Sequence, residues 1–427
     1  MVNPYDIFTE RGFVYQCTDE DGLRDIFEKE KVTAYIGFDA TADSLHVGSL
    51  VPIMALAWLQ RTGHRPLAIV GGGTTMVGDP SGKTEARQLL SRQDIRRNME
   101  GLKRQLSRFI NFDEGQAIMV DNGDWLLSLN YIEFLRDIGK HFSVNRMLAA
   151  ESYKMRLETG LTFIEFNYML LQAYDFLVLF QNYKNKLQMG GQDQWGNIVA
   201  GIDLIRRVEG GQAFGLTFPL LHDPKTGAKF GKTHQGAVWL DKEKTSPYDF
   251  FQFWRNTDDR AVENFLGLFT FLPIDEVRKL GSLDGSLINR AKEILAYEVT
   301  ANNHGHEEAA KAYLASVKAF GQADPQGQIK TSSRIAKLAA DKSQDVPTTK
   351  LPLNQFKDGL GALDLFILAG LAKSKGEARR LIRQGGAYVN GQRIKQEDQT
   401  FSQTDLDDGA LTLRAGKKRY HCLRVKT

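Results

Sequence analysis

Residues 35–50 constrain the fold most strongly, because they read as a strand, a polar turn and the start of a helix in immediate succession. The strand breaks at Gly37, the turn runs through residues 41–44, and the helix is expected to begin at about His46. A helix N-terminus exposes unpaired backbone N–H groups and the positive end of the helix dipole. The segment therefore predicts an anion site, in which Gly48 would admit a ligand to the backbone and His46 would donate a hydrogen bond.

A second strand and turn follow directly. One strand–turn–helix unit alone occurs in most α/β domains, but here the unit is repeated. Residues 65–70 are a short apolar run that ends at Gly71-Gly72-Gly73. Such repetition is typical of a doubly wound parallel sheet, in which ligands bind at the carboxyl ends of the strands. We therefore assign the chain to the α/β class, with a Rossmann-like catalytic domain over residues 1–222 and a helical insertion at about 100–160.

The rest of the chain divides into three parts by composition. Residues 223–320 begin with a lysine-containing loop and then read as an α-helical domain, 321–355 are rich in polar residues and read as a linker, and 356–427 read as a small α+β domain. From residue 360 onward, 13 Lys and Arg stand against 7 Asp and Glu, so this part carries +6 although the whole chain carries only +3. A basic module on a mildly acidic body predicts a polyanion partner.

Composition also excludes several classes of protein. A chain of 427 residues with 42% hydrophobic and 25% charged residues is expected to be globular, with two or three domains. The two cysteines, Cys17 and Cys422, argue against a disulfide framework and a cysteine-based zinc site, and they suit a reducing cytoplasm. We find neither an apolar run of membrane-spanning length nor a signal peptide, so we expect a cytoplasmic protein with no membrane partner.

Residues 163–183 read as a long apolar helix with three polar side chains on one face. Tyr168, Gln172 and Asp175 are separated by four and three residues, which places them above one another on a helix. Buried polar groups require partners. The cluster therefore predicts either a structural network in the core or a site for a small ligand that carries an amine or a hydroxyl.

A third strand–turn–helix pattern covers residues 187–197. Its turn contains Gly190-Gly191, and Asp193 and Gln194 open the helix that follows. An aspartate at this position either caps the helix N-terminus or binds a ribose diol.

Two further loops carry cations. The loop that begins at Gly78 leads to Lys83 and Arg87, and it reads either as a lid that grips phosphate or as an ordinary solvated loop. Lys229 and Lys232 flank a glycine in a second loop, which suits a mobile clamp on phosphate charge. A charged surface loop has the same pattern, so neither loop is specific by itself.

Residues 374–393 read as a basic helix, a strand and a hairpin turn at Asn390-Gly391. The alternatives for this helix are a solvated basic face and contact with an RNA backbone, and the charge excess favours RNA. The cations of the helix are Lys375, Arg379, Arg380 and Arg383.

Taken in order, these motifs resemble those of the bacterial-type tyrosyl-tRNA synthetases, which are class I aminoacyl-tRNA synthetases. The sequence HVGSL at 46–50 resembles the first class I signature, and KFGKT at 229–233 resembles the second. The tyrosine subgroup is matched at 35–41, 78–83, 168–175 and 190–198, and residues 356–427 resemble the S4 RNA-binding domain. The likeness covers nearly the whole chain, and the agreement of seven motifs in order makes it much more specific than any one of them.

The resemblance implies an ATP-dependent tyrosine–tRNA ligase. Such an enzyme joins tyrosine to AMP with release of pyrophosphate, and then transfers the tyrosyl group to the 3′ end of tRNA(Tyr). Tyr35 and Asp175 would hydrogen-bond the phenolic hydroxyl of tyrosine. The residues expected at its ammonium and carboxylate groups are Asp79, Tyr168, Gln172 and Gln194.

The resemblance also implies the residues that handle ATP, which would arrive with Mg²⁺ and need no metal ligated by the protein. Catalytic roles on the phosphates fall to Thr41, His46, Lys83, Arg87, Lys229 and Lys232. Nucleotide binding falls to Asp39, His46, Gly48, Ser49, Gly191, Asp193 and Lys232. Family members are homodimers, and the insertion at about 100–160 would contribute to the interface.

The chain departs from the family pattern at a few positions, and rival functions remain to be weighed. Ser49 stands where the first signature has its second His, Gln192 stands where Ser is frequent, and Ile36 and Val51 are apolar where some relatives contact ribose.

A tryptophanyl-tRNA synthetase shares the catalytic architecture, but Asp175 with an S4-like tail favours tyrosine. The other rivals are a non-catalytic RNA-binding or splicing protein on a synthetase scaffold and a generic adenylating enzyme.

Overall fold

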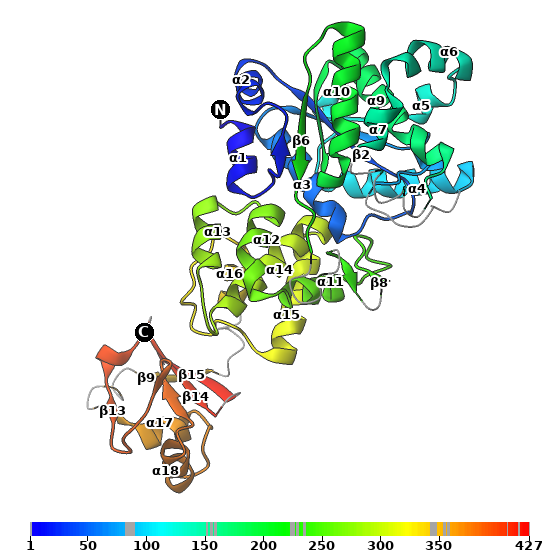
Figure 1. Ribbon diagram of the computed structural model, residues 1–427. Helices are drawn as coiled ribbons and strands as arrows, with labels where there is room; N and C mark the ends of the chain where they lie inside the picture. The colour runs from blue at the N-terminus through cyan, green and yellow to red at the C-terminus, as the bar shows by residue number, and fades with distance from the viewer. Residues whose placement is uncertain are drawn as a thin grey trace. The chain divides into compact units, whose positions relative to one another are not determined.

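In the computed structural model, the chain forms two compact units, Met1–Ala323 and Asp324–Thr427 (Figure 1). The described residues are 2–81, 90–150, 153, 157, 160–222, 227, 230–233, 236–341, 348–352, 356, 359–407, 409–416 and 419–426.

The first unit is built on a six-stranded sheet with the order β1-β6-β5-β2-β3-β4, in which only β1 runs antiparallel to its neighbour. The chain runs outward from β2 through β3 to β4 and then returns to the other side of β2 with β5 and β6. The strand order therefore reverses between β2 and β5, as in a doubly wound sheet. This confirms the Rossmann-like α/β fold. The strands are β1 (Gln16–Cys17), β2 (Thr33–Phe38), β3 (Arg65–Val70), β4 (Ile118–Asp121), β5 (Asn185–Gly191) and β6 (Phe214–Phe218).

Helices cover both faces of this sheet. α3 (Leu50–Arg61) connects β2 to β3 and α10 (Trp195–Glu209) connects β5 to β6. Crossovers between parallel strands are right-handed as a rule, and these two lead in opposite directions, which places the two helices on opposite faces by that rule. α9 (Phe163–Tyr183) packs beside α10, as Figure 1 shows, and also contacts β5. It begins at the predicted residue with a capping box formed by Thr162 and Glu165.

α9 is the one described helix that is long and apolar enough to cross a membrane by length and composition. Within its most apolar window, 56% is buried inside the protein. Most of its buried apolar residues belong to a core cluster that also contains residues of β2 and β3. We therefore interpret α9 as a helix of the protein core that packs on the sheet.

The remaining helices of the first unit form the periphery of the sheet and a helical part that follows it. The buried side chain of Arg11 donates to the backbone oxygens of Gly267, Thr270 and Leu272, which ties the helical part to the N-terminus. These helices are α1 (Pro4–Glu10), α2 (Glu20–Lys29), α4 (Arg92–Leu106), α5 (Gly123–Leu126), α6 (Tyr131–Asp137), α7 (Val144–Leu148), α11 (Pro247–Arg255), α12 (Val262–Phe269), α13 (Ile274–Gly281), α14 (Ile288–His304) and α15 (His306–Phe320).

The second unit is a small α+β domain around the five-stranded sheet β12-β11-β14-β15-β9. The predicted hairpin turn is present, with φ of 46° at Asn390 and 77° at Gly391. Its elements are α16 (Ile335–Asp341), β9 (Thr348–Pro352), β10 (Leu360–Gly361), α17 (Ala362–Leu368), α18 (Lys375–Arg383), β11 (Ala387–Val389), β12 (Gln392–Arg393), β13 (Thr400–Phe401), β14 (Ala410–Ala415) and β15 (Arg419–Lys426).

The structure differs from the sequence-based expectation in two places. The segment 321–355 is not only a linker, because β9 pairs in parallel with β15 and Leu351 is buried in the core of the second unit. The apolar residues 218–221 also read as a strand in the sequence, whereas the structure places that strand four residues earlier, as β6, which ends before Pro219. Proline cannot donate a hydrogen bond to a neighbouring strand, so the ladder stops there.

Candidate active site

A cavity of about 180 Å³ opens between the carboxyl ends of β2 and β5, where the strand order of the sheet reverses. This is the position at which doubly wound sheets bind their ligands. The side chains that line it come from β2, β3, β5, α9 and the loops after the strands. They are Tyr35, Ile36, Gly37, Phe38, Asp39, Pro52, Ile69, Gly71, Thr74, Asp79, Asn122, Tyr168, Gln172, Asp175, Gln188, Met189, Gly190, Gly191 and Gln194.

At one end of the cavity, Tyr35 and Asp175 offer polar groups to a ligand. The hydroxyl of Tyr35 is buried and has no hydrogen-bond partner among the described residues. The carboxylate of Asp175 accepts hydrogen bonds from Asn122 Nδ2 at 2.9 Å and from Trp125 Nε1 at 2.7 Å. Burial raises the pKa of Asp175 to about 7 in spite of these two donors. A ligand hydroxyl here would satisfy the phenol and share a proton with the carboxyl group.

A second polar cluster lies around Asp79. Gln194 Nε2 donates to Asp79 Oδ2 at 2.8 Å, and the backbone N–H of Ser81 donates to Asp79 Oδ1 at 2.9 Å. Gln172 and Asn197 extend this cluster through hydrogen bonds to Gln194 Oε1 at 3.2 and 3.1 Å. Burial, assisted by the negative charge of Asp39, raises the pKa of Asp79 to about 6. A buried carboxylate without a cationic partner among these contacts is suited to an ammonium group.

Asp39 makes a separate set of polar contacts in the cavity. Its Oδ1 atom accepts hydrogen bonds from the hydroxyl of Tyr168 at 3.3 Å and from Thr74 Oγ1 at 3.5 Å. Asp39 and Gly191 both line the cavity at the carboxyl ends of β2 and β5. A Cβ atom at Gly191 would lie 2.6 Å from the carboxylate of Asp193, so a side chain at position 191 would require this carboxylate to shift. The 3₁₀ turn Gln192–Gln194 that contains Asp193 leads into α10, whose N-cap residue is Gln194.

The first signature has a different internal geometry from the one that the sequence suggests. His46 Nδ1 accepts a hydrogen bond from the backbone N–H of Gly48 at 3.0 Å, so the ring caps the short 3₁₀ turn Val47–Ser49 that precedes α3. The ring lies so close that a Cβ atom at Gly48 would approach it to 2.7 Å. The neutral ring therefore carries its proton on Nε2. Ser49 precedes α3 and makes no side-chain cap.

The two signatures pack against one another. The backbone at Gly231 has a φ of +85°, and a Cβ atom there would lie 2.6 Å from Val47. The second signature leads into the hairpin β7 (Lys232–Thr233) and β8 (Gly236–Ala237), after which Val238 accepts a backbone hydrogen bond from Val47. Sequence motifs alone did not predict this contact, because it joins segments that are about 190 residues apart.

Part of the predicted cationic machinery lies outside the described residues, namely Lys83, Arg87 and Lys229. Lys232 is described only as part of β7, and Thr41 is exposed in the turn after β2. Thr41, His46, Gly48, Ser49 and Asp193 are not among the cavity-lining residues. Within the described part of the chain, no group of three or more His, Cys, Asp or Glu side chains could hold a metal ion.

The four cations predicted to contact RNA all belong to α18 or its first turn, but three of them are ion-paired on the surface of the second unit. Lys375 pairs with Asp364 at 2.8 Å, and Arg379 and Arg383 both pair with Glu397. Exposed pairs of this kind contribute little stability and are readily exchanged for a phosphate. Arg380 is exposed.

Comparison with known proteins agrees with the motifs. Residues 28–321 match the family described as "tRNA synthetases class I (W and Y)", and residues 339–423 match the "Tyrosine--tRNA ligase SYY-like C-terminal domain". The chain is 57% identical over 427 residues to the tyrosine–tRNA ligase of Desulfosudis oleivorans, covering 99% of this chain and 98% of that protein.

Solved structures show the same fold. A C-terminally truncated mitochondrial tyrosyl-tRNA synthetase from Aspergillus nidulans superposes with a TM-score of 0.67 at 30% identity, covering 75% of this chain and 95% of that one. A tryptophanyl-tRNA synthetase from Encephalitozoon cuniculi superposes with a TM-score of 0.54 at 14% identity, over 74% of this chain and 90% of that one, which is a likeness of fold alone. The sequence relationship over the whole length decides between the two: this chain belongs to the tyrosine–tRNA ligase family of class I aminoacyl-tRNA synthetases.

Proposed function

We propose that tyrosine binds in the cavity between β2 and β5, with its phenolic hydroxyl between Tyr35 and Asp175. The observation that carries the proposal is the buried hydroxyl of Tyr35, which has no partner among the described residues. Leaving such a group unsatisfied costs about 1–3 kcal/mol, which a tyrosine hydroxyl would recover and a phenylalanine ring would not. Asn122 and Trp125, which fix the carboxylate of Asp175, become positioning residues of the same subsite.

The ammonium group of tyrosine is assigned to the cluster around Asp79. Asp79 supplies the charge, Tyr168 and Gln172 supply acceptor oxygens, and Gln194 lies toward the carboxylate of the substrate. Asn197 and Ser81 lie within the matched motifs but were given no role there, and they hold this cluster together through Gln194 and Asp79. With both ends of the amino acid held, its carboxylate points toward the carboxyl edge of the sheet, where the ATP site is proposed.

The chemistry then requires no protein nucleophile. The tyrosine carboxylate attacks the α-phosphorus of ATP, pyrophosphate leaves, and the protein aligns the reactants and stabilises the growing negative charge. We assign the nucleotide to Asp39, Gly48, Ser49, Gly191 and Asp193. Stabilisation of the departing pyrophosphate is assigned to Thr41, His46, Lys83, Arg87, Lys229 and Lys232.

Mg²⁺ is proposed to enter as the complex with ATP. The polar residues of the cavity form two hydrogen-bonded clusters and not a set of converging oxygen ligands, which is compatible with a metal held mainly by phosphate and water. The ion would neutralise phosphate charge and leave with pyrophosphate.

The second unit is proposed to bind tRNA(Tyr) through α18, with Arg380 as its most available cation. A homodimer is proposed as well. Of the exposed large apolar side chains in the described residues, a run concentrates between residues 127 and 164, where the interface was expected. It consists of Leu127, Tyr131, Ile132, Leu135, Val144, Leu157, Phe163 and Ile164. The reduced cysteines suit the cytoplasm as the site of action.

The assignment is tested by exchange of labelled pyrophosphate into ATP, which reports the first half-reaction alone. We expect exchange that depends on tyrosine and is negligible with tryptophan at the same concentration. Equal exchange with tryptophan, or none with tyrosine, would refute the placement of the phenol between Tyr35 and Asp175.

A further inference from the structure

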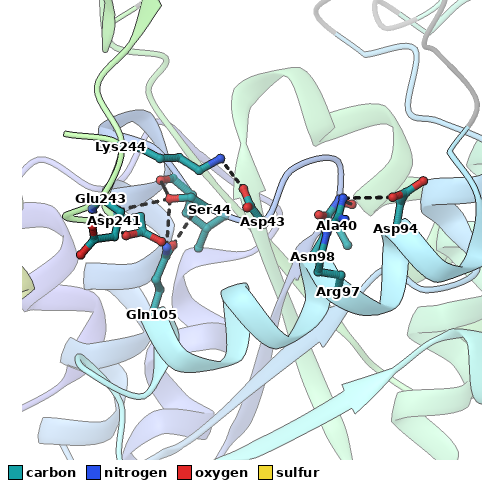
Figure 2. Close-up of polar contacts among 11 residues, drawn as sticks. Ala40, Asp43, Ser44, Asp94, Arg97, Asn98, Gln105, Asp241, Glu243 and Lys244 are labelled. Carbon is teal, nitrogen blue, oxygen red and sulfur yellow. Dashed lines mark hydrogen bonds and ion pairs between the residues drawn. The ribbon is translucent and has the colours of Figure 1, made fainter.

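One face of α4 supports the turn that follows β2. Asn98, Gly101 and Gln105 are spaced by three and four residues, so they share a face of the helix. Asn98 Nδ2 donates to the backbone oxygen of Ala40 at 2.8 Å. A Cβ atom at Gly101 would lie 1.9 Å from the backbone oxygen of Asp43, so the turn rests directly on the helix, as Figure 2 shows.

Gln105 is the centre of a buried network that reaches from α4 to the turn before the first signature and to Asp241, in the segment that follows β8. Its side chain is 3% exposed, and its Oε1 atom accepts from the backbone N–H of Leu45 at 2.8 Å. Its Nε2 atom donates to Ser44 Oγ at 2.9 Å, and Ser44 Oγ also accepts from the backbone N–H of Asp241 at 3.3 Å. Both the oxygen and the nitrogen of the Gln105 amide are thus used to hold the turn before His46 (Figure 2).

An ion pair and a backbone ladder join the same turn to the segment after β8. Lys244 Nζ pairs with the carboxylate of Asp43 and lies 5.0 Å from the ring centroid of Trp239. Trp239 forms an antiparallel bridge with His46, and the backbone N–H of Leu240 donates to the oxygen of Leu45 at 2.9 Å. The segment that leaves the second signature is therefore fastened to the first.

We propose that Gln105 and the Asp43–Lys244 pair are positioning residues for adenylate formation. They fix the first signature against α4 and fasten the second signature to it, so that groups on both meet the phosphates of ATP in one geometry. None of the three lines the tyrosine cavity. The inference rests on the proposed function and predicts an effect on the chemical step without an effect on tyrosine binding.

The first test replaces Gln105 by Met, which keeps the volume and removes the amide. Gln60 is the control, because its amide also accepts one hydrogen bond and donates one, here with the backbone of Asn111 at 2.9 and 2.6 Å, from a half-buried position away from the signatures. We expect Gln105→Met to lower kcat for pyrophosphate exchange about ten-fold, with the Kd for tyrosine changed less than about two-fold. Gln60→Met is expected to leave both values near those of the wild type.

The second test is a double-mutant cycle on the ion pair with Asp43→Asn and Lys244→Met. Each single change is expected to lower kcat about two- to five-fold. The kcat of the double variant is expected to be no lower than that of the less active single variant. Lys186 and Glu30 provide the control, since their pair has exposures of 36% and 42%, against 35% and 43% for Lys244 and Asp43. Lys186→Met and Glu30→Gln should leave kcat unchanged.

The outcomes separate this inference from the proposed function. Tyrosine-dependent exchange by the wild type tests the function, whereas the variants test the positioning role. Wild-type kcat in Gln105→Met, an equal loss in Gln60→Met, or additive losses in the ion-pair cycle would each overturn the inference. A parallel loss of tyrosine affinity would also overturn it, because it would reveal a general structural role.

Discussion

At the scale of single residues, the cavity contains buried polar groups that lack a hydrogen-bond partner or a cationic partner among the described contacts. Buried polar atoms are nearly always hydrogen-bonded in folded proteins, so the orphaned hydroxyl of Tyr35 indicates a missing ligand atom. Asp175 and Asp79 carry raised pKa values for the same reason, since burial disfavours their charged forms. Perturbed groups of this kind concentrate at functional sites.

The raised pKa of Asp79 predicts how tyrosine binding depends on pH. In the free site this pKa is about 6, so the carboxylate that receives the ammonium group is charged above pH 6 and neutral below it. We expect the Kd for tyrosine to be constant above this value and to rise towards about ten-fold per pH unit below it. Equilibrium binding between about pH 4.5 and 7.5 measures the effect.

The control for this measurement is Asp79→Asn, which should bind tyrosine weakly and without an inflection near pH 6. Any inflection that remains near pH 7 would belong to Asp175, whose pKa is about 7. An unchanged inflection near pH 6 in Asp79→Asn would contradict the assignment of the ammonium group to Asp79.

The relative positions of residues could be predicted where chemistry and spacing coincide, whereas their roles stay a prediction. Tyr168, Gln172 and Asp175 were recognisable because four- and three-residue spacing aligns them on α9, and the structure brings all three to one cavity. Asn122 and Trp125 were not predicted, because the segment after β4 contains no motif. Their role becomes visible only in the structure, where both donate hydrogen bonds to the buried carboxylate of Asp175. The packing of Gly48 against His46 was also invisible, since it depends on the rotamer of the ring.

At the scale of elements, α4 shows how a peripheral helix can serve the site. Gly101 lies in its interior, where glycine normally costs about 1 kcal/mol relative to alanine. Gly101→Ala should nevertheless destabilise the first unit, because the added Cβ atom would displace the backbone of Asp43. Thermal unfolding measures this effect, and kcat for pyrophosphate exchange should fall with it.

Gly376 in α18 is the matched position, because a Cβ atom there would meet nothing closer than Ser374 Oγ at 3.8 Å. Gly376→Ala should therefore leave stability unchanged or raise it by up to about 1 kcal/mol. A stabilising effect of Gly101→Ala would contradict the close approach of the turn to α4.

The second element with a direct test is α18. Arg380→Glu should weaken tRNA aminoacylation, mainly through KM for tRNA, and the salt dependence of binding should become shallower. Pyrophosphate exchange should be unaffected, because it does not involve tRNA. Lys29→Glu, an exposed exchange on α2, is the control, and an equal effect of both variants on aminoacylation would refute a specific role for α18.

Helices and strands could be predicted where the local sequence pattern determines them. They were missed where pairing with a distant segment determines the structure. The capping box and the apolar run fixed the start of α9 at Phe163. β9 has a polar sequence, and it becomes a strand only because β15, about 70 residues later, pairs with it. The linker expected over residues 321–355 therefore failed for a physical reason, since no local signal encodes that pairing.

At the scale of the whole molecule, the exposed apolar residues between 127 and 164 predict self-association. Ile132 is 70% exposed and Phe163 is 69% exposed. Exposed apolar side chains that gather in this way mark interaction surfaces. Ile132→Asp should shift the protein from dimer to monomer at micromolar concentration, as measured by sedimentation equilibrium. Val2→Asp, at a residue that is 64% exposed near the N-terminus, should not. A monomeric wild type would contradict the proposal.

The fold alone does not determine the substrate of the molecule, because a tryptophanyl-tRNA synthetase shares it at a TM-score of 0.54. The sequence relationship assigns the chain to the tyrosine family, and we propose that the residues in the cavity select tyrosine. The central claim is therefore that Tyr35 and Asp175 recognise the hydroxyl of the substrate.

The most direct test is the ratio of kcat/KM for tyrosine to that for phenylalanine in the exchange reaction, measured for the wild type and for Tyr35→Phe. The variant removes the orphaned hydroxyl, so we expect the ratio to fall about ten-fold, through weaker use of tyrosine and better use of phenylalanine. Tyr153→Phe, which loses a buried hydroxyl bonded to the Phe166 oxygen at 2.8 Å, should keep the wild-type ratio. An unchanged ratio in Tyr35→Phe would contradict recognition of the substrate hydroxyl by this residue.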